Sequence, residues 1–336
     1  MKAVIFRQHG GPEVLEYADV PEPAIGPGEI LVRVRACALN HLDVWIRQGV
    51  PAYRIALPHI SGCDVAGTVE RLGAGVTTLA AGDRVVLAPG LPCGACDWCR
   101  AGDDSLCAAY RIRGAAVDGG YAEFASARAT DAIRLPERLS FEAAAAFPLV
   151  FLTAWHMLVG RAKLRAGEHV LVHAAGSGVG HAAVQIAKHL GAVVYTTVGS
   201  EAKISKAKAL GAEEVINYRT GGFEERIKAL TQGRGVNVVC EHIGPDTWEQ
   251  SVRVLAKGGR LVTCGATSGP SASLDLRYLF SRQLSLLGSM MGTRAEFDAV
   301  TQLVCAGRLT PSVDTVFPLQ EARAAQERML GRDVFG

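Results

Sequence analysis

The stretch EHVLVHAAGSGVGHAAVQIAKHLG, residues 168–191, contains the turn that decides the fold. It begins with a compact apolar strand, and its second half places Val179, Ala183, Ile186 and Leu190 on one face of a helix. A run of small residues joins the two. Strand, glycine-rich turn and helix in this order expose backbone N–H groups and the positive end of the helix dipole, which together bind a pyrophosphate. The stretch therefore predicts a dinucleotide-binding turn.

The glycine fingerprint of such turns, G-x-G-x-x-G, is imperfect here. Ala175 and Ser177 stand in place of the first two glycines, whereas Gly178 and Gly180 still permit close packing. We expect Ser177, Gly178, Val179 and Gly180 to contact the dinucleotide. The alternative is an ordinary connection between a strand and a helix that binds nothing.

Strands and helices alternate after residue 140. The apolar runs of this region are EHVLV, AVVYTTV, EEVINY, VNVVCE and GRLVTC. Such alternation predicts an α/β fold with a doubly wound parallel sheet and right-handed crossovers. In contrast, the first third contains short strands bounded by glycine, such as GEILVRVRACAL (28–39) and GGYAEFA (119–125), and predicts a small β-barrel-like domain.

The residues after the second strand of the α/β region bear on which nicotinamide dinucleotide binds. An NAD site usually carries an acidic residue about 20 residues beyond the glycine turn, to hold the ribose 2′-hydroxyl. Here the chain offers Ser200 and no carboxylate until Glu201, while Lys203 and Lys206 lie close by. Ser200, Lys203 and Tyr218 are suited to a 2′-phosphate, so the sequence predicts NADPH.

Four cysteines form a separate motif within residues 90–107. Cys93, Cys96, Cys99 and Cys107 have C-x2-C-x2-C-x7-C spacing. Four thiolates suit a closed tetrahedral zinc site, in which no coordination position remains for water or substrate. We therefore expect one structural zinc ion per subunit. An iron–sulfur cluster and unliganded thiols are the alternatives, although ferredoxin motifs place proline after the fourth cysteine, where this chain has alanine.

Composition excludes several classes of function. The net charge is +2 and there is no long basic run, so we expect no nucleic-acid partner. The N-terminus lacks the features of a secretion signal. Residues 143–160 carry no formal charge, but Pro148 and His156 within them favour a buried helical region over a membrane span. We expect a cytoplasmic protein with no membrane partner and a small-molecule substrate.

The motifs together resemble those of the medium-chain dehydrogenase/reductases over the whole chain, in particular the quinone oxidoreductase-like and enoyl reductase branch. The resemblance rests on residues 26–49, 62–76 and 208–218, the four-cysteine lobe and the glycine turn.

The resemblance implies three parts. A GroES-like catalytic domain spans residues 1–139 and includes the zinc lobe, a Rossmann domain spans 140–291, and residues 292–336 return to the first domain through a strand and an amphipathic helix. It further implies a homodimer, or a tetramer, paired through a strand within residues 283–292.

The chain departs from the zinc alcohol dehydrogenases of this family at the catalytic zinc. Asn40, Cys63 and Leu149 stand at the three ligand positions, and Trp45 replaces the proton-relay histidine. Asparagine is a poor zinc ligand and leucine cannot be one. A rearranged site built from Cys37, His41, Cys63 and Asp64 remains the alternative.

By position in the family pattern, Asn40, Asp43 and Tyr53 should border the substrate, and Thr153 should approach the cofactor. We expect Asp43 to fix the local loop. The implied activity is NADPH-dependent hydride transfer to a quinone, enone, enal or enoyl thioester without catalytic zinc. A zinc-dependent alcohol dehydrogenase with a rearranged site and an NADPH-binding redox sensor with little turnover are the alternatives.

Overall fold

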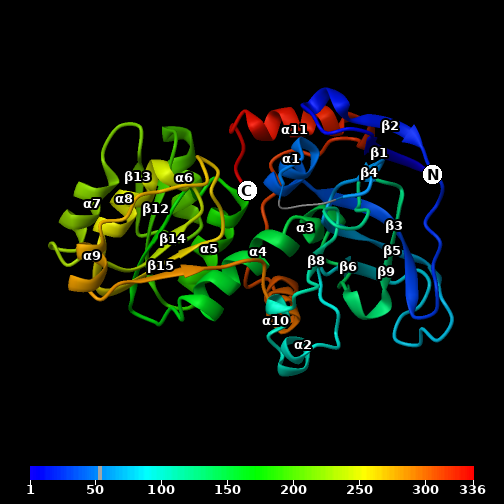
Figure 1. The fold of residues 1–336 in the computed structure, drawn as a ribbon, viewed down its shortest axis with the longest axis horizontal. Coiled ribbons are helices and arrows are strands. Elements are labelled where there is room, and N and C mark those ends of the chain that lie inside the picture. The colour runs from blue at the N-terminus through cyan, green and yellow to red at the C-terminus, as the bar shows by residue number, and fades with distance from the viewer. Residues whose placement is uncertain (52–54) are drawn as a thin grey trace. The chain divides into compact units, whose positions relative to one another are not determined.

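The computed structural model describes residues 1–51 and 55–336, which form two compact units (Figure 1). The first unit contains residues 1–149 and 293–334, and the second contains 150–292 and 335–336. The boundary thus lies beyond residue 139, the position expected from the sequence. The physical reason is that helix α3 (Phe141–Ala145) packs against strands of the first unit, β3 (Glu29–Ala38) and β5 (Asp64–Leu72).

The first unit is built on antiparallel strands. Its other strands are β1 (Lys2–Phe6), β2 (Glu16–Asp19), β4 (His59–Ile60), β6 (Arg84–Leu87), β7 (Gly90–Leu91), β8 (Arg111–Ile112), β9 (Phe124–Arg128) and β10 (Ala132–Arg134). A five-stranded sheet has the order β10-β6-β5-β3-β9, a three-stranded sheet has the order β2-β1-β4, and β7 pairs with β8. This arrangement is the expected GroES-like β-barrel domain.

The alternating pattern of β3 produces the core of this domain. Ile30 and Val32 are buried against Val65 and Val85 of the neighbouring strands. On the other face, Arg33 donates two hydrogen bonds to Glu70, at 2.9 and 2.7 Å. One expected strand is shifted, because within residues 119–125 only the end belongs to β9.

Helices of the first unit surround these sheets. They are α1 (His41–Gln48), α2 (Asp97–Ala101), α3, α10 (Arg294–Cys305) and α11 (Ala322–Leu330), with 3-10 turns at Pro12–Val14, Asp104–Leu106, Ala129–Asp131 and Leu319–Glu321. The C-terminal segment supplies α10 and α11 to this unit. The strand expected within that segment is absent, since the described residues 306–318 form no strand.

The second unit contains one six-stranded parallel sheet. Its strands are β11 (His169–Val172), β12 (Val193–Val198), β13 (Glu214–Asn217), β14 (Val236–Glu241), β15 (Leu255–Thr263) and β16 (Ser285–Gly288). The spatial order is β13-β12-β11-β14-β15-β16, and every pair is parallel. The direction of strand addition reverses between β11 and β14, as in a Rossmann sheet, so the doubly wound fold is confirmed.

Helices precede the first strand of this sheet and connect the strands along the chain. They are α4 (Pro148–Trp155, the first two residues in the other unit), a π-helical turn (His156–Arg161), α5 (Gly178–His189), a 3-10 turn (Glu201–Lys203), α6 (Ile204–Ala209), α7 (Phe223–Leu230), α8 (Pro245–Arg253) and α9 (Leu276–Ser281). The apolar residues 143–160 fold into α3, α4 and the π-helical turn. Among the described residues, no helix is long and apolar enough to span a bilayer.

Candidate active site

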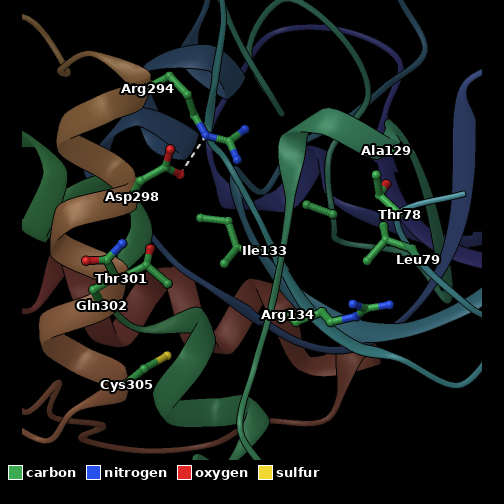
Figure 2. Close-up of a pocket in the computed structure, with 11 residues that line it drawn as sticks. Thr78, Leu79, Ala129, Ile133, Arg134, Arg294, Asp298, Thr301, Gln302 and Cys305 are labelled. Atoms are coloured by element: carbon green, nitrogen blue, oxygen red, sulfur yellow. Dashed lines mark hydrogen bonds and ion pairs between the residues drawn. The ribbon is translucent and has the colours of Figure 1, made fainter. Parts of the chain in front are cut away.

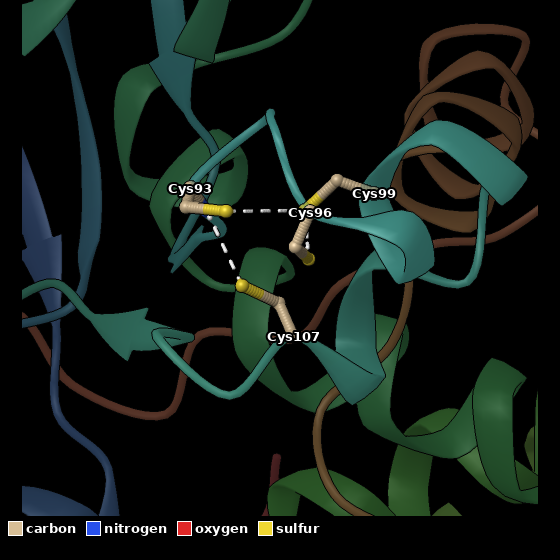
Figure 3. Close-up of side chains that lie close together, drawn as sticks. All are labelled: Cys93, Cys96, Cys99 and Cys107. Carbon is tan, nitrogen blue, oxygen red and sulfur yellow. Dashed lines mark hydrogen bonds between the residues drawn. The ribbon is translucent and has the colours of Figure 1, made fainter.

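The four cysteines of the lobe converge on one point (Figure 3). All four sulfur atoms lie within 4.8 Å of one another; Cys93 and Cys99 are 3.8 Å apart, and Cys96 and Cys99 are 3.4 Å apart. Tetrahedral Zn–S bonds of about 2.3 Å require S···S separations of ~3.8 Å. Cys93, Cys96, Cys99 and Cys107 therefore fit a zinc ion with four thiolate ligands.

The lobe is also attached to distant parts of its unit. Asp104 accepts hydrogen bonds from the backbone N–H of Arg294, at 3.1 and 3.2 Å, and so caps helix α10. Arg128 donates to the carbonyl of Pro92 at 3.3 Å and forms an ion pair with Asp131 at 2.9 Å. A metal ion in the lobe would thus stabilise the N-terminus of α10 and the corner between β9 and β10.

Asn40 lies at the N-cap of α1, where the sequence places the first catalytic-zinc ligand of the zinc enzymes. Its amide nitrogen donates to Asp64 Oδ2 at 2.9 Å and contacts Cys63 Sγ at 3.3 Å. The second oxygen of Asp64 accepts from the backbone N–H of Leu149 at 2.9 Å. Asn40, Cys63, Asp64 and Leu149, hereafter the Asn40 cluster, are thus connected by hydrogen bonds through one buried carboxylate.

Burial sets the protonation behaviour of the Asn40 cluster. Asp64 is 1% exposed, and this burial raises the pKa of its carboxyl to about 7, although the donors Asn40 and Leu149 oppose the rise. Burial also raises the pKa of Cys63 well above its ordinary value. In the metal-free protein Cys63 is therefore a neutral thiol at neutral pH.

Asp43 supports the loop that carries Asn40. Its carboxylate accepts from the backbone N–H groups of Asn40 (2.7 Å) and Gly62 (3.1 Å) and from the hydroxyl of Tyr121 (2.9 Å). Burial raises the pKa of Asp43 to about 6. With three donors around it, Asp43 fixes the position of the α1 N-terminus relative to the strand that leads to Cys63.

The other sequence-predicted residues of this region are less well connected. His41 is exposed and lies edge-on to Trp45, with the ring centres 5.1 Å apart. Although the residue is exposed, partial desolvation of the ring and the nearby Arg332 lower the pKa of His41. Tyr53 lies outside the described residues.

The Asn40 cluster does not have the composition of a metal site. Within residues 1–51 and 55–336, the lobe cysteines are the one group of three or more His, Cys, Asp or Glu side chains with closely spaced ligand atoms. Cys37, His41, Cys63 and Asp64, the residues of the alternative rearranged site, form no such group.

The glycine turn in the second unit is built by Ser177. Its hydroxyl accepts from the N–H of Gly180 at 3.1 Å and donates to the carbonyl of Ala174 at 2.9 Å. A side chain at Gly180 would lie 2.1 Å from the Ala174 carbonyl oxygen, so glycine is required there. The first N–H groups of a helix have no intrahelical partner, which leaves those of Gly178 and Val179 available to a phosphate. The turn fits a pyrophosphate.

Thr153 belongs to α4, beside this turn. A side chain at Gly178 would lie 2.8 Å from Val150 Cγ1, so α4 packs against the first turn of α5. Thr153 is buried and lies one helical turn after Val150, on the same face. The structure therefore places Thr153 on the face of α4 that carries Val150.

Ser200, Lys203 and Tyr218 come from the ends of two adjacent parallel strands, β12 and β13. The phenol oxygen of Tyr218 lies 2.5 Å from where a side chain at Gly199 would begin, so this ring covers Gly199. Ser200 is extended and begins the 3-10 turn that contains Lys203. The carboxylate of Glu201 accepts from the Asn217 amide at 2.7 Å and is thereby engaged within the protein.

Two functional contacts were missed by sequence reasoning. The sequence pattern indicates Asp64 only as a possible metal ligand, whereas in the structure it is the hydrogen-bond acceptor that connects Asn40 with Leu149. Tyr121, the partner of Asp43, is 78 residues away along the chain. No local pattern identifies either contact, because both depend on the packing of the barrel.

A pocket of about 470 Å³ lies elsewhere in the first unit, between strand β10 and helix α10 (Figure 2). Arg294 and Asp298 form an ion pair at 2.8 Å on its helix side, and Arg134 on its strand side pairs with Asp83 at 2.8 Å. Its lining contains none of the residues of the Asn40 cluster. Its charged groups are already paired, so it is a poor candidate for the chemistry.

Two family models match most of the chain. Residues 26–137 match the alcohol dehydrogenase GroES-like domain, and residues 178–306 match the zinc-binding dehydrogenase domain. A quinone oxidoreductase of Rattus norvegicus is 32% identical over 98% of this chain and 94% of its own length.

Two solved structures extend the comparison. The structure of an NAD-dependent alcohol dehydrogenase is 46% identical, with a TM-score of 0.97, over 100% of this chain and 98% of the other. A crotonyl-CoA carboxylase/reductase in complex with NADP is 28% identical, with a TM-score of 0.92, over 100% of this chain and 93% of the other. The chain belongs to the medium-chain dehydrogenase/reductase superfamily, a family of nicotinamide-dependent oxidoreductase enzymes.

Proposed function

We propose that this enzyme uses NADPH to reduce a quinone or an α,β-unsaturated carbonyl compound, without a catalytic zinc ion. The observation that carries the proposal is the Asn40 cluster, in which the ligand positions of zinc alcohol dehydrogenases hold an amide, a neutral thiol and a leucine connected through Asp64. Asparagine is a poor zinc ligand and leucine is none, so Cys63 is the one usual zinc-ligand type at the three positions.

The chemistry of the acceptor follows from this composition. The bound nicotinamide supplies a hydride, which leaves negative charge on the accepting molecule. A simple carbonyl concentrates that charge on one oxygen and needs a Lewis acid or a strong proton donor. A quinone or an enone spreads the charge over a conjugated system, so neutral hydrogen-bond donors are sufficient.

Asn40 is the proposed donor to the substrate oxygen. Its amide nitrogen has two hydrogens, one of which goes to Asp64 at 2.9 Å, while the other meets the sulfur of Cys63 at 3.3 Å. Neutral sulfur is a weak acceptor. A substrate oxygen can therefore replace Cys63 as the partner while Asp64 keeps the amide oriented. Asp43 holds the loop, and Tyr53 is proposed to orient the substrate.

The experiment is a steady-state assay of NADPH oxidation with a panel of quinones, enones and enals, and with simple ketones as the comparison. We expect turnover with the conjugated acceptors and little with the ketones. Asn40→Ala and Tyr53→Phe should each lower turnover while NADPH binding changes little. Unchanged turnover in both variants would refute these assignments.

A zinc-dependent alcohol dehydrogenase is the second candidate, because the solved structure that is 46% identical bears the name NAD-dependent alcohol dehydrogenase. Elemental analysis separates the two functions. One zinc per subunit supports the proposed reductase with a structural ion in the lobe. Two zinc ions per subunit, together with oxidation of alcohols, would establish the dehydrogenase.

The preference for NADPH is proposed to depend on Ser200, Lys203 and Tyr218. Gly199→Ala should displace the Tyr218 ring, since the new Cβ would lie 2.5 Å from its hydroxyl oxygen. We expect the ratio of NADPH to NADH affinity to fall by about tenfold, the loss of one hydrogen bond to a charged group. Gly221→Ala is the matched control, because a Cβ at that position meets no atom within 4 Å. If the ratio of NADPH to NADH affinity is the same in the two variants, Tyr218 does not contact the cofactor.

The proposed assembly is a homodimer. Strand β16 is at the edge of the six-stranded sheet, and Leu276 and Phe280 of the neighbouring α9 are 65% and 70% exposed. An edge strand with apolar side chains beside it is suited to pairing with a second copy. Light scattering of the wild type and of Phe280→Glu measures the mass, and a monomeric variant is the expected outcome.

A further inference from the structure

A network of hydrogen bonds between buried polar side chains lies next to the glycine turn. His173 ends the segment that leads from β11 into the turn and is 1% exposed. Its Nε2 lies 2.8 Å from the hydroxyl oxygen of Ser251, and its Nδ1 lies 3.4 Å from that of Thr197. The next residue, Ala174, donates its backbone N–H to the Thr197 hydroxyl oxygen at 2.9 Å.

The hydrogen-bond directions in this network follow from Glu241. Its carboxylate is fully buried; one oxygen accepts from the hydroxyls of Ser251 and Thr247, both at 2.9 Å. The other oxygen accepts from the backbone N–H groups of Ile243 (2.6 Å) and Gly244 (3.2 Å). Because an ionised carboxylate only accepts, the Ser251 hydroxyl donates its hydrogen bond to Glu241 and must itself accept from His173 Nε2–H. Nδ1 of His173 is then the acceptor for the Thr197 hydroxyl.

The charge states agree with this order. Burial lowers the pKa of His173 to about 4, so the ring is neutral at physiological pH. Burial alone would raise the pKa of Glu241, but His173 and the surrounding donors outweigh it and the pKa is lowered. A serine, a histidine and a glutamate in contact are reminiscent of a hydrolase. However, Ser251 is fully buried and its proton points to Glu241, so it is not a nucleophile.

This hydrogen-bond network connects the ends of β12 and β11 with the end of β14, across the point where the strand order of the sheet reverses. Thr197 is the next-to-last residue of β12, His173 follows β11, Glu241 ends β14, and Ser251 belongs to α8. A second contact joins the same two strand ends, since His242 Nε2 lies 2.9 Å from the backbone oxygen of His173. In doubly wound sheets the ligand lies at the carboxyl ends of the strands on either side of this reversal.

We propose that His173, held through Ser251 by Glu241, is a positioning residue for the dinucleotide: it fixes the glycine turn relative to the loop at residues 242–244. The inference rests on the proposed function only in requiring that the turn bind a nicotinamide dinucleotide. This hydrogen-bond network is enclosed within the second unit and touches no substrate. It therefore sets affinity for the cofactor and leaves the chemical step unchanged.

Ser251→Ala tests the inference. It removes the acceptor that lies 2.8 Å from His173 Nε2 and one of the two hydroxyl donors to the same Glu241 oxygen, so the turn loses its fixed position. We expect the dissociation constant for NADPH, measured by fluorescence titration of the cofactor-free protein, to rise by about tenfold. The turnover number at saturating NADPH should stay within about twofold of wild type, since only binding is affected. Ser251→Thr retains the hydroxyl and should restore most of the affinity.

Thr231→Val is the matched control. Thr231 is another buried hydroxyl of the same unit, which donates to the carbonyl of Ile227 at 2.7 Å and accepts from the N–H of Gly235 at 3.0 Å. It should lower the melting temperature as Ser251→Ala does, with no change in NADPH affinity. If both variants weaken binding equally, or neither does, the positioning role is refuted.

Two further measurements keep the outcome decisive. If Ser251→Ala does not fold, Thr247→Val removes another donor from the same carboxylate and should raise the dissociation constant a few-fold; unchanged affinity would overturn the inference. Nitrogen NMR of the wild type should show His173 neutral with its proton on Nε2, and a proton on Nδ1 would overturn it. A wild type that binds neither NADPH nor NADH would instead refute the proposed function.

Discussion

The lobe and the Asn40 cluster are two places in one domain where the family framework can hold zinc, and they differ in chemistry. In the lobe, four sulfur atoms lie within 4.8 Å of one another and point toward a common centre. In the Asn40 cluster, the polar atoms are already joined to each other, because Asp64 accepts from both Asn40 and Leu149. The difference shows that a metal site depends on how many suitable ligand atoms converge on one point, not on the position of a loop.

Cys107→Ser should have the largest effect of the four changes that test this comparison. Cys107 is buried in the lobe, and its loss leaves three thiols, too few for a closed site. Because metal binding contributes directly to folding, we expect zinc to fall to nearly none per subunit and the melting temperature to fall by about 10 °C. Elemental analysis and calorimetry measure the two quantities.

The double variant Asn40→Cys, Leu149→Cys should convert the cluster into a second metal site. It places two thiols beside Cys63 and removes the amide that now donates to Asp64. Zinc should rise from one to two per subunit, and activity with conjugated acceptors should fall. A zinc content that stays at one ion per subunit would show that the backbone at these positions, and not only their side chains, prevents metal binding.

Asp64→Asn tests the buried carboxylate through the pH dependence of stability. Burial raises the pKa of Asp64 from about 3.9 in the unfolded chain to about 7 in the native state. The native state therefore holds this proton more tightly. Its contribution to stability is complete below about pH 4 and is lost as the pH rises through about 7.

The free energy of unfolding of the wild type should accordingly decline by roughly 2–4 kcal/mol over this range. Asp64→Asn should remove most of that decline. Asp43, whose pKa burial raises to about 6, remains in both proteins and is the internal reference. Denaturant titrations from pH 4.5 to 8 measure how the free energy of unfolding changes with pH. If the curves of wild type and variant are parallel, a group other than Asp64 causes the decline.

Much of the fold could be predicted from the sequence, because its signals are local. The period-two pattern around Arg33 and the spacing of the four cysteines depend on neighbours along the chain, and both have the expected structure. The glycine turn is equally local, since Ser177 closes it with a contact three residues away. The expected strand at residues 119–125 is displaced, since the backbone N–H groups of residues 119–121 bond to residues 60–62 and β9 begins only at Phe124.

The polar contacts of the candidate site could not be predicted in the same way. Asp64 reaches Leu149 across 85 residues, and His173 reaches Ser251 across 78. Such pairs are decided by how strands and helices pack, and no periodic pattern encodes them. The sequence therefore indicated which residue types lie near the chemistry, whereas the direction of each hydrogen bond came only from the structure.

Cys63→Ser should have the smallest effect, and it is the matched partner of Cys107→Ser, since both replace one buried thiol by a hydroxyl. A serine at this position can accept from the Asn40 amide in place of the sulfur. We therefore expect zinc to stay at one per subunit and the melting temperature to fall by only about 2–4 °C, the cost of roughly 1 kcal/mol. Because oxygen is a stronger acceptor than neutral sulfur, it should also hold the amide hydrogen that the substrate needs, so turnover should fall a few-fold. A loss of zinc comparable to that in Cys107→Ser would instead identify Cys63 as a zinc ligand. The lobe and the Asn40 cluster would then both be zinc sites and would differ only in how much zinc each one binds.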